Sequence, residues 1–280
     1  MLEPEIYTFQ EQAVLGYEDN TDKIITQNSI YIYNDDGAGE SCLEYIFDTL
    51  VNITTAYKIN FINAKDILCK EWTKNAVLLV MPGGEDIPYT KKLNGEGNKI
   101  IKQYVENGGS YLGFCAGAYY GSNFVEFDKN GELEVLGERE LAFFPDKSIG
   151  PILAKYDYKT NSGARAALLK LDMPNEHDFT NLRVYYNGGG YFYNADSYTN
   201  VKVLAYYHIE KDDNYLPALV EINYNKGKVI LSGVHFECSS KLLDANDTYK
   251  AELLPMLEKE EENRIKFNIL ILKRLGIEIE

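Results

Sequence analysis

Histidine and cysteine are scarce in this sequence, which has three histidines and four cysteines in 280 residues. No two cysteines form a Cys-x-x-Cys pair, so the spacing argues against the common structural zinc motifs, and we expect no metal site. Four cysteines are also too few for the dense disulfide framework of a small secreted protein. The cysteine content therefore favours a reducing setting.

Long apolar runs and an N-terminal leader are missing as well. Residues 1–5 lack a basic stretch followed by an apolar core, and no apolar run reaches the ~18 residues that a membrane span needs. The net charge is 28 − 43 = −15, and such an acidic surface repels nucleic-acid phosphates and anionic membranes. We expect a cytoplasmic protein with neither a nucleic-acid nor a membrane partner.

What is present, up to about residue 122, is an alternation of short apolar runs and amphipathic stretches. Continuous apolar runs are typical of strands that are covered on both faces of a parallel sheet. We expect strands at 29–34, 57–63, 76–81 and 110–114, and helices around 43–51, 100–105 and 116–122. This order predicts an α/β fold with a doubly wound, mostly parallel sheet of flavodoxin-like type.

The second half of the chain has a different texture. Apolar runs follow one another with little helix between them, which predicts additional antiparallel strands, at 152–158, 183–186, 201–207, 218–224 and 228–232. The last two runs are joined by Asn225-Lys226-Gly227 and read as a hairpin. We divide the chain into an N-terminal extension (1–28), one α/β domain (29–246) and a C-terminal helical segment (247–280).

The segment Gly113-Phe114-Cys115-Ala116-Gly117 has the Gly-x-nucleophile-x-Gly pattern of a strand–turn–helix elbow. The glycines allow close approach of neighbouring backbone around a strained turn. The helix that starts at Ala116 points its N-terminus at the Cys115 sulfur, where it stabilises a thiolate and can help to hold an oxyanion. The alternative interpretation is a small buried cysteine in a glycine-rich turn.

A thiol nucleophile needs a base, and His235 is the best candidate because it comes directly after a buried strand. Glu237 lies two residues later and could orient the imidazole, which would complete a Cys115–His235–Glu237 triad. His235 considered alone also fits a structural role. His177 and His208 lie next to polar stretches and read as surface residues.

Two glycine-rich loops follow predicted strands. Pro82-Gly83-Gly84 ends the third strand beside the expected crevice, so the Gly83 and Gly84 N–H groups, with that of Ala116, are candidate oxyanion donors. The same tripeptide can also be a simple turn. The run Asn187–Gly190 lacks a Walker lysine and a following helix, so it does not predict a phosphate cradle, and we expect no cofactor.

Together these residues resemble the class I glutamine amidotransferase superfamily, in which a Cys attacks an amide, a His relays protons and a Glu orients the His. The longer blocks are similar to the N-terminal domain of eukaryotic-type biotin–protein ligases; these blocks are residues 81–89, 93–98, 111–121, 138–145, 163–165 and 185–190. The resemblance assigns the triad roles to Cys115, His235 and Glu237. One departure is Phe236, which stands where the superfamily usually has proline.

Three functions are consistent with this resemblance. The chain could hydrolyse or transfer an amide or acyl group of a small-molecule substrate through a Cys115 thioester. Alternatively, it could be a non-catalytic auxiliary module that assists a ligase-type protein partner, or a small-molecule sensor that uses the same crevice. The sequence has no Gly-Arg-Gly-Arg-type adenylate loop, so we expect that it does not attach biotin by itself.

Overall fold

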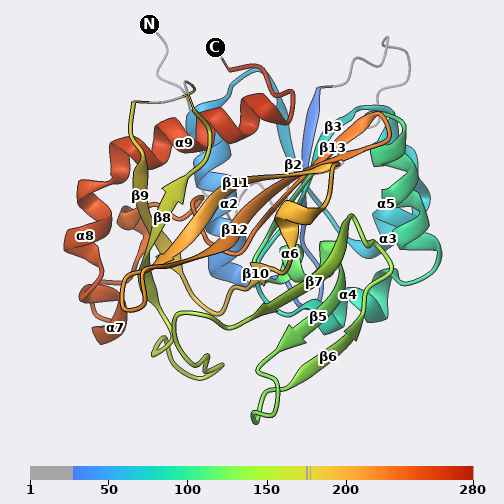
Figure 1. Cartoon of the computed structure of the whole chain (residues 1–280). Coiled ribbons are helices and arrows are strands. Elements are labelled where there is room, and N and C mark those ends of the chain that lie inside the picture. Colours follow the sequence, from blue (N-terminus) through green and yellow to red (C-terminus); the bar gives the residue numbers. More distant parts are fainter. Residues whose placement is uncertain (1–27, 175, 177, 280) are drawn as a thin grey trace, which may run out of the picture.

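The computed structural model describes residues 28–174, 176 and 178–279, which form an α/β structure around a nine-stranded sheet (Figure 1). Apart from residue 28, the predicted N-terminal extension lies outside the described residues. The strand order is β2 (Lys58–Ile62), β1 (Ser29–Tyr33), β3 (Ala76–Met81), β4 (Ser110–Phe114), β13 (Gly227–Ser232), β12 (Asn214–Tyr224), β11 (Val201–Ile209), β8 (Arg165–Leu171) and β9 (Asn181–Tyr186).

The nine-stranded sheet is mixed. The strands from β2 to β13 pair in parallel, whereas β13, β12, β11, β8 and β9 pair in antiparallel fashion. The alternation of strands and helices that predicted an α/β fold is confirmed, and so are additional antiparallel strands in the second half. These strands extend the same sheet rather than forming a separate one.

Helices cover both faces of the parallel strands. Alternate residues of one strand enter different cores: Leu112 and Phe114 of β4 pack with one set of helices, and Tyr111 packs with the other. The first set is α2 (Glu40–Ile53) and α9 (Glu261–Arg274), and the second contains α3 (Ala64–Cys69), α4 (Asp86–Leu93) and α5 (Glu96–Glu106). Burial on both faces explains why the parallel strands are continuously apolar.

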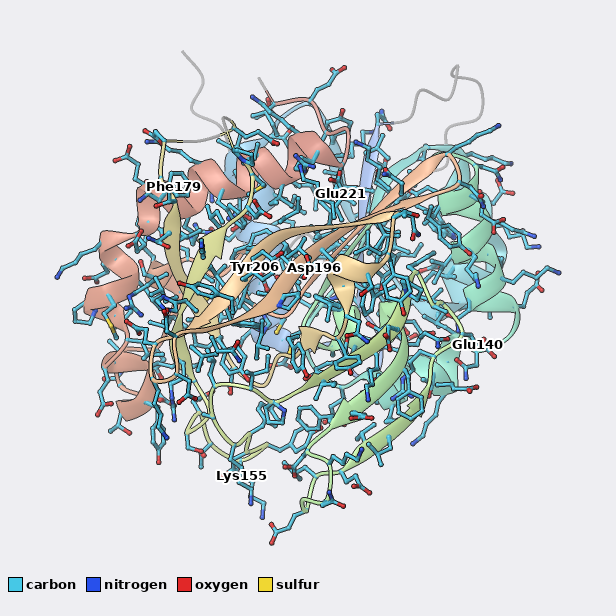
Figure 2. All side chains as sticks on the ribbon, in the orientation of Figure 1. Glu140, Lys155, Phe179, Asp196, Tyr206 and Glu221 are labelled. Carbon is cyan, nitrogen blue, oxygen red and sulfur yellow. The ribbon has the colours of Figure 1, made fainter. Side chains whose placement is uncertain are left out.

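A second sheet of four strands lies beside the first. Its order is β10 (Tyr191–Phe192), β7 (Phe144–Gly150), β5 (Ser122–Phe127) and β6 (Val135–Glu138). Glu140, which follows β6, accepts hydrogen bonds from the Gly95 N–H at 2.6 Å and from Asn98 Nδ2 at 2.9 Å (Figure 2 labels Glu140). Polar contacts of this kind hold the small sheet against the start of α5.

The predicted strand at 152–158 is wrong. Pro151 has no N–H to offer a ladder, and the N–H groups of Ile152 and Leu153 donate to Tyr186 Oη at 2.7 and 3.2 Å instead of to a strand. The segment between β7 and β8 therefore crosses the surface without regular structure, and Lys155 on it points into solvent (Figure 2).

After residue 247 the described chain contains α7 (Thr248–Ala251), α8 (Leu254–Lys259) and α9. Phe267 of α9 packs against Phe236 with ring centroids 5.2 Å apart. In the part of the chain that the structure describes, no helix is both long and apolar enough to cross a membrane.

Candidate active site

Cys115 forms the turn between β4 and α6 (Ala116–Gly121). Its backbone has φ +46° and ψ −103°, a combination that L-residues rarely adopt, and its N–H donates to Ser232 O of the neighbouring strand β13 at 2.8 Å. The side chain is buried, with 8% exposed, and lines a pocket. A strained turn that presents a thiol to a pocket is the geometry that the Gly-x-Cys-x-Gly pattern predicts.

The two glycines of this pattern are required by close backbone contacts. A Cβ on Gly113 would lie 2.5 Å from Gly117 O, and a Cβ on Gly117 would overlap Met81 O at the end of β3. Gly117 N–H also donates to Pro82 O at 3.0 Å. The elbow therefore packs directly against the backbone at the end of β3, and a larger residue at 117 would push α6 away from the sheet.

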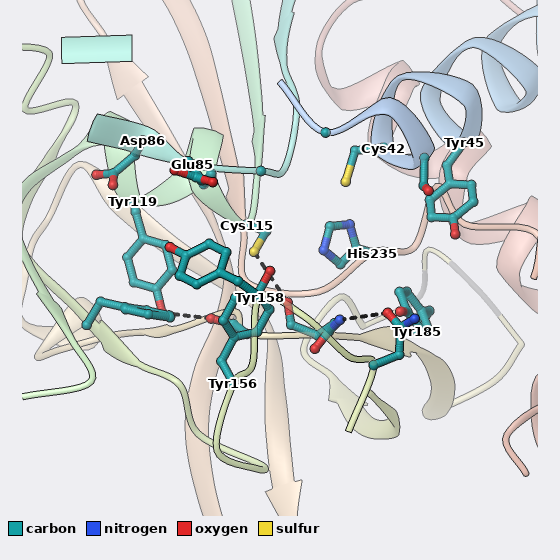
Figure 3. Close-up of a pocket in the computed structure, with 18 of the residues that line it drawn as sticks. Cys42, Tyr45, Glu85, Asp86, Cys115, Tyr119, Tyr156, Tyr158, Tyr185 and His235 are labelled. Carbon is teal, nitrogen blue, oxygen red and sulfur yellow. Dashed lines mark hydrogen bonds between the residues drawn. The ribbon is translucent and has the colours of Figure 1, made fainter. Parts of the chain in front are cut away.

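His235 and Glu237 follow β13, the strand next to β4, and the structure brings them together. His235 Nδ1 lies 2.7 Å from Glu237 Oε1, and the two side chains are only 4% and 2% exposed. Burial lowers the pKa of His235, but the charge of Glu237 and hydrogen bonds with Cys115 and Glu237 outweigh burial, so that its pKa stands well above its usual value. Figure 3 shows the imidazole and the Cys115 sulfur side by side.

Phe236 separates these two residues and acts as their anchor. Its ring packs against Phe114 of β4, with centroids 4.8 Å apart, and its carbonyl accepts from Asn268 Nδ2 at 2.7 Å and from Arg264 Nη1 at 3.0 Å. Because Phe236 points into the core, His235 and Glu237 on either side of it project toward each other. Proline is thus not required here to place the histidine and the carboxylate.

The Gly83–Gly84 turn is held by the turn that follows β1. Gly39 N–H donates to Gly83 O at 3.0 Å, and Gly84, at φ +136°, leaves no room for a Cβ beside Gly37 O. Gly84 and Ala116 line the pocket with Cys115, and neither of their N–H groups is used in a hydrogen bond within the described residues. Gly83 is not part of the pocket lining and lies against the imidazole of His235, where a Cβ on Gly83 would be 2.8 Å from His235 Cε1.

The pocket has a volume of about 360 Å³. Its walls contain residues that sequence reasoning did not find, namely Cys42, Tyr45, Tyr119, Phe127, Tyr156, Tyr158, Asn187 and Lys250. The sequence signals near them were the glycine-rich run at 187–190 and, for Tyr119, the predicted helix at 116–122. In the structure, Asn187 O lies 3.7 Å from Cys115 Sγ, and a Cβ on Gly188 would be 2.6 Å from Tyr156 Cδ2.

The other cysteines have different surroundings. Cys42, on α2, also lines the pocket, and burial raises its pKa to about 12. Burial likewise raises the pKa of Cys238 well above its usual value, whereas Cys69 is exposed. Cys115 differs from all three because a thiol in contact with a carboxylate-bound imidazole can pass its proton to that imidazole.

The remaining histidines lie elsewhere. His208, on β11, is half-buried and 3.0 Å from Asp213, while His177 is outside the described residues. Within the described ranges, no group of three or more His, Cys, Asp and Glu side chains is arranged to hold a metal ion.

Comparison with known proteins now places the chain in a family. The family model for the N-terminal part of biotin–protein ligase matches residues 28–280. The chain belongs to this family. It is 35% identical over 254 residues to the biotin–protein ligase of Schizosaccharomyces pombe. The matched region covers 90% of this chain but only 38% of the ligase.

A second relative matches this chain over most of the length of both proteins. An uncharacterized protein of Chlamydia muridarum is 31% identical over 256 residues, covering 88% of this chain and 94% of that protein. Among solved structures, a ThuA-like protein of Bacteroides uniformis overlaps 89% of this chain and 95% of its own with 15% identity and a TM-score of 0.47. An overlap this weak adds nothing about function.

Proposed function

We propose that this chain is an auxiliary module related to the N-terminal part of biotin–protein ligase, and that it assists a ligase or another protein partner. The observation that carries this proposal is the family match over residues 28–280, together with 35% identity to a ligase of which it spans 38%. The rest of that ligase lies outside the matched part, so the module would work on a partner rather than attach biotin itself.

The test is a biotinylation assay with a ligase lacking the matched N-terminal part, an acceptor domain, biotin and ATP. We expect no labelled acceptor when this chain replaces the ligase, and faster labelling or measurable binding when the two are combined. Labelling by this chain alone, or no binding and no change in rate with the ligase, would contradict the auxiliary role.

A second candidate function is cysteine-dependent hydrolysis or transfer of an amide or acyl group. It is favoured by the presence of Cys115 and His235 in the lining of one pocket, with Glu237 bonded to the imidazole. In this mechanism His235 takes the thiol proton, the Cys115 sulfur attacks the substrate carbonyl carbon, and Glu237 holds the imidazolium. The unused N–H groups of Gly84 and Ala116 would face the developing oxyanion. The bond from the carbonyl carbon to the leaving group would then break, and that group would depart with the proton from His235, which leaves the thioester. Water or an amine, deprotonated by His235, would attack the thioester carbonyl, and the C–S bond would break to return the Cys115 thiol.

Limited alkylation tests the thiol chemistry directly. With limiting iodoacetamide at pH 6.5 and mass-spectrometric mapping, Cys115 should label faster than Cys42 and Cys238. His235→Gln should slow Cys115 by about tenfold, because the thiolate loses its counter-ion. Exposed Cys69 is the internal control and should not change. Equal labelling of Cys115 in wild type and His235→Gln would remove this candidate.

The two candidates can be separated with Cys115→Ser. If the chain is only an auxiliary module, this variant should assist the ligase as well as wild type does. If the thiol is needed, the assistance should disappear while binding to the ligase remains.

We also infer that the parallel half is of the flavodoxin-like type that class I glutamine amidotransferases share. Support comes from the strand order β2-β1-β3-β4-β13, which matches the 2-1-3-4-5 order of that type, and from the position of Cys115 at a strand's carboxyl end.

A further inference from the structure

One end of the pocket is walled by a continuous group of aromatic rings. Tyr119 of α6 meets Phe127 of β5 with ring centroids 5.8 Å apart, Phe127 meets Tyr156 at 5.9 Å, and Tyr156 meets Tyr158 at 4.9 Å, all edge to face. All four line the same pocket as Cys115. Figure 3 shows the tyrosines of this group gathered on one side of the Cys115 sulfur.

The charge at this end of the pocket is negative. Glu85, just before α4, is exposed, lines the pocket and has no ion pair within the described residues. Burial raises the pKa of Tyr158, and the negative charges of Glu85 and Asp86 raise it further, so the ring lies within electrostatic reach of both carboxylates. Asp86 itself is bound by Arg139, whose Nε lies 2.7 Å from Asp86 Oδ2.

Two side chains of the lining can carry a positive charge, His235 and Lys250. His235 is paired with Glu237, with Nδ1 2.7 Å from Oε1, and Lys250 belongs to the other end of the pocket. The charge of Lys250 acts on Cys42 and Cys238, whose thiol pKa it lowers against the larger effect of burial. The residues of the aromatic end, Tyr119, Phe127, Tyr156, Tyr158 and Glu85, therefore offer π faces and an unpaired carboxylate and include no cation.

We propose that the aromatic end of the pocket, formed by Tyr119, Phe127, Tyr156 and Tyr158 with Glu85, binds the alkylammonium group of an amine next to Cys115. Aromatic rings attract an organic cation through their negative faces, and a nearby carboxylate supplies the opposite charge. A pocket of about 360 Å³ has room for such a group on a short carbon chain. The proposal depends on the pocket and not on catalysis by Cys115.

The reaction rates of charged thiol reagents at Cys115 report the charge preference of this subsite, because Cys115 lies beside it. A methanethiosulfonate reacts with a thiolate so that a new S–S bond forms, the S–SO₂CH₃ bond breaks, and methanesulfinate leaves with the electron pair. The rate constants of the trimethylammonium-ethyl and the sulfonato-ethyl reagents are measured at Cys115 by mass spectrometry. Exposed Cys69 in the same molecule corrects for the overall charge of the chain.

We expect the cation-to-anion rate ratio at Cys115 to exceed that at Cys69 by about tenfold. Glu85→Gln and Tyr158→Leu should each lower the ratio by about three- to tenfold, whereas Tyr158→Phe, which keeps the ring face, should not. The matched control is Glu258→Gln on α8, which removes the same charge from an exposed site outside the pocket lining. It should leave the ratio unchanged.

The neutral methyl methanethiosulfonate separates the two proposals. A slow reaction at Cys115 with this reagent counts against the thiol chemistry, whereas an absent cation preference counts against the amine subsite. If Cys115 does not react at all, saturation-transfer NMR with n-butyltrimethylammonium decides: a signal that Glu85→Gln weakens and Glu258→Gln does not supports the subsite.

Competing ligands identify the source of the ammonium group. Protection of Cys115 by n-butylammonium but not by Nα-acetyllysine methylamide indicates a free amine, and protection by both indicates that a lysine side chain also fits. The proposal is overturned if the ratio at Cys115 does not exceed that at Cys69, or if Glu85→Gln and Glu258→Gln behave alike.

Discussion

The two sides of the pocket are built in different ways. Cys115, His235 and the Gly83–Gly84 turn follow the parallel strands β4, β13 and β3, whose carboxyl ends meet at one edge of the sheet. Most of the aromatic wall, formed by Tyr119, Phe127, Tyr156 and Tyr158, comes from elsewhere. Phe127 lies on β5 of the small sheet and Tyr156 and Tyr158 on the irregular segment after β7, whereas Tyr119 belongs to α6. Sheet geometry thus fixes the reactive side, whereas a few side-chain contacts fix the wall, and substitutions should affect the two separately.

The largest effect is expected where these two regions are joined. Arg139, after β6, and Asp86, at the start of α4, form a buried ion pair with Nε–Oδ2 at 2.7 Å. Arg139→Met should cost about 3 to 5 kcal/mol in the free energy of unfolding, because it leaves a buried carboxylate without its partner. Urea unfolding at pH 7 measures the loss.

Two controls accompany the Arg139 variant. The double variant Arg139→Met/Asp86→Asn should regain much of the lost stability, and Lys74→Met, which breaks an exposed pair with Glu71, should change nothing measurable. If Arg139→Met is as stable as wild type, the small sheet does not depend on this pair.

The second effect tests the rigidity of the reactive side. Gly117→Ala should destabilise the protein by about 2 to 3 kcal/mol, because the new Cβ overlaps the main-chain Met81 O, which cannot move without β3. Gly97→Ala is the matched control: on α5 the new Cβ meets only the Leu93 side chain, at 3.0 Å from Cδ2 and 3.2 Å from Cβ, and overlaps no carbonyl oxygen of a strand. Thermal unfolding of both variants should rank Gly97→Ala close to wild type. The reverse ranking would contradict the close packing of the elbow.

The third effect tests how the wall is held. Tyr186 Oη accepts from the N–H groups of Ile152 and Leu153 and donates to Gly189 O at 3.0 Å. Tyr186→Phe should cost about 1 to 2 kcal/mol and speed hydrogen exchange in residues 151–164, because two partly buried N–H groups lose their acceptor. Tyr215→Phe, at an exposed hydroxyl, is the control. Exchange that stays unchanged in 151–164 would show that other contacts hold the wall.

The difference between a side built on strand ends and a wall held by side-chain contacts also explains what the sequence could predict. Strands 76–81 and 110–114 were predicted with the bounds that the structure shows, because apolar runs and flanking glycines carry a strong local signal. Cys115 and His235 could be paired because each follows a strand of the parallel half. The irregular part of the wall could not be predicted: Tyr156 sits in a run that alternates like a strand, and its long-range contacts with Phe127 and Gly188 leave no local signal in the sequence.

The smallest effect is a pH dependence that belongs to the His235–Glu237 pair. The pKa of His235 in the folded protein lies well above the value of about 6.5 that it has when unfolded. The stability that protonated His235 contributes is therefore fully present below pH 6.5 and is lost as the pH rises through the folded pKa. The difference in unfolding free energy between the parent and His235→Gln should shrink between pH 6 and pH 9.

This measurement uses Cys115→Ala as the parent, so that titration of that thiol does not contribute. Glu237→Gln is the control, because without the carboxylate charge the histidine loses the largest of the interactions that raise its pKa. In that background the effect of His235→Gln should vary less with pH. A difference that stays constant or grows from pH 6 to pH 9 would show that His235 is neutral in the folded protein, and the reactive side would then hold a neutral imidazole beside Cys115 rather than a preformed imidazolium.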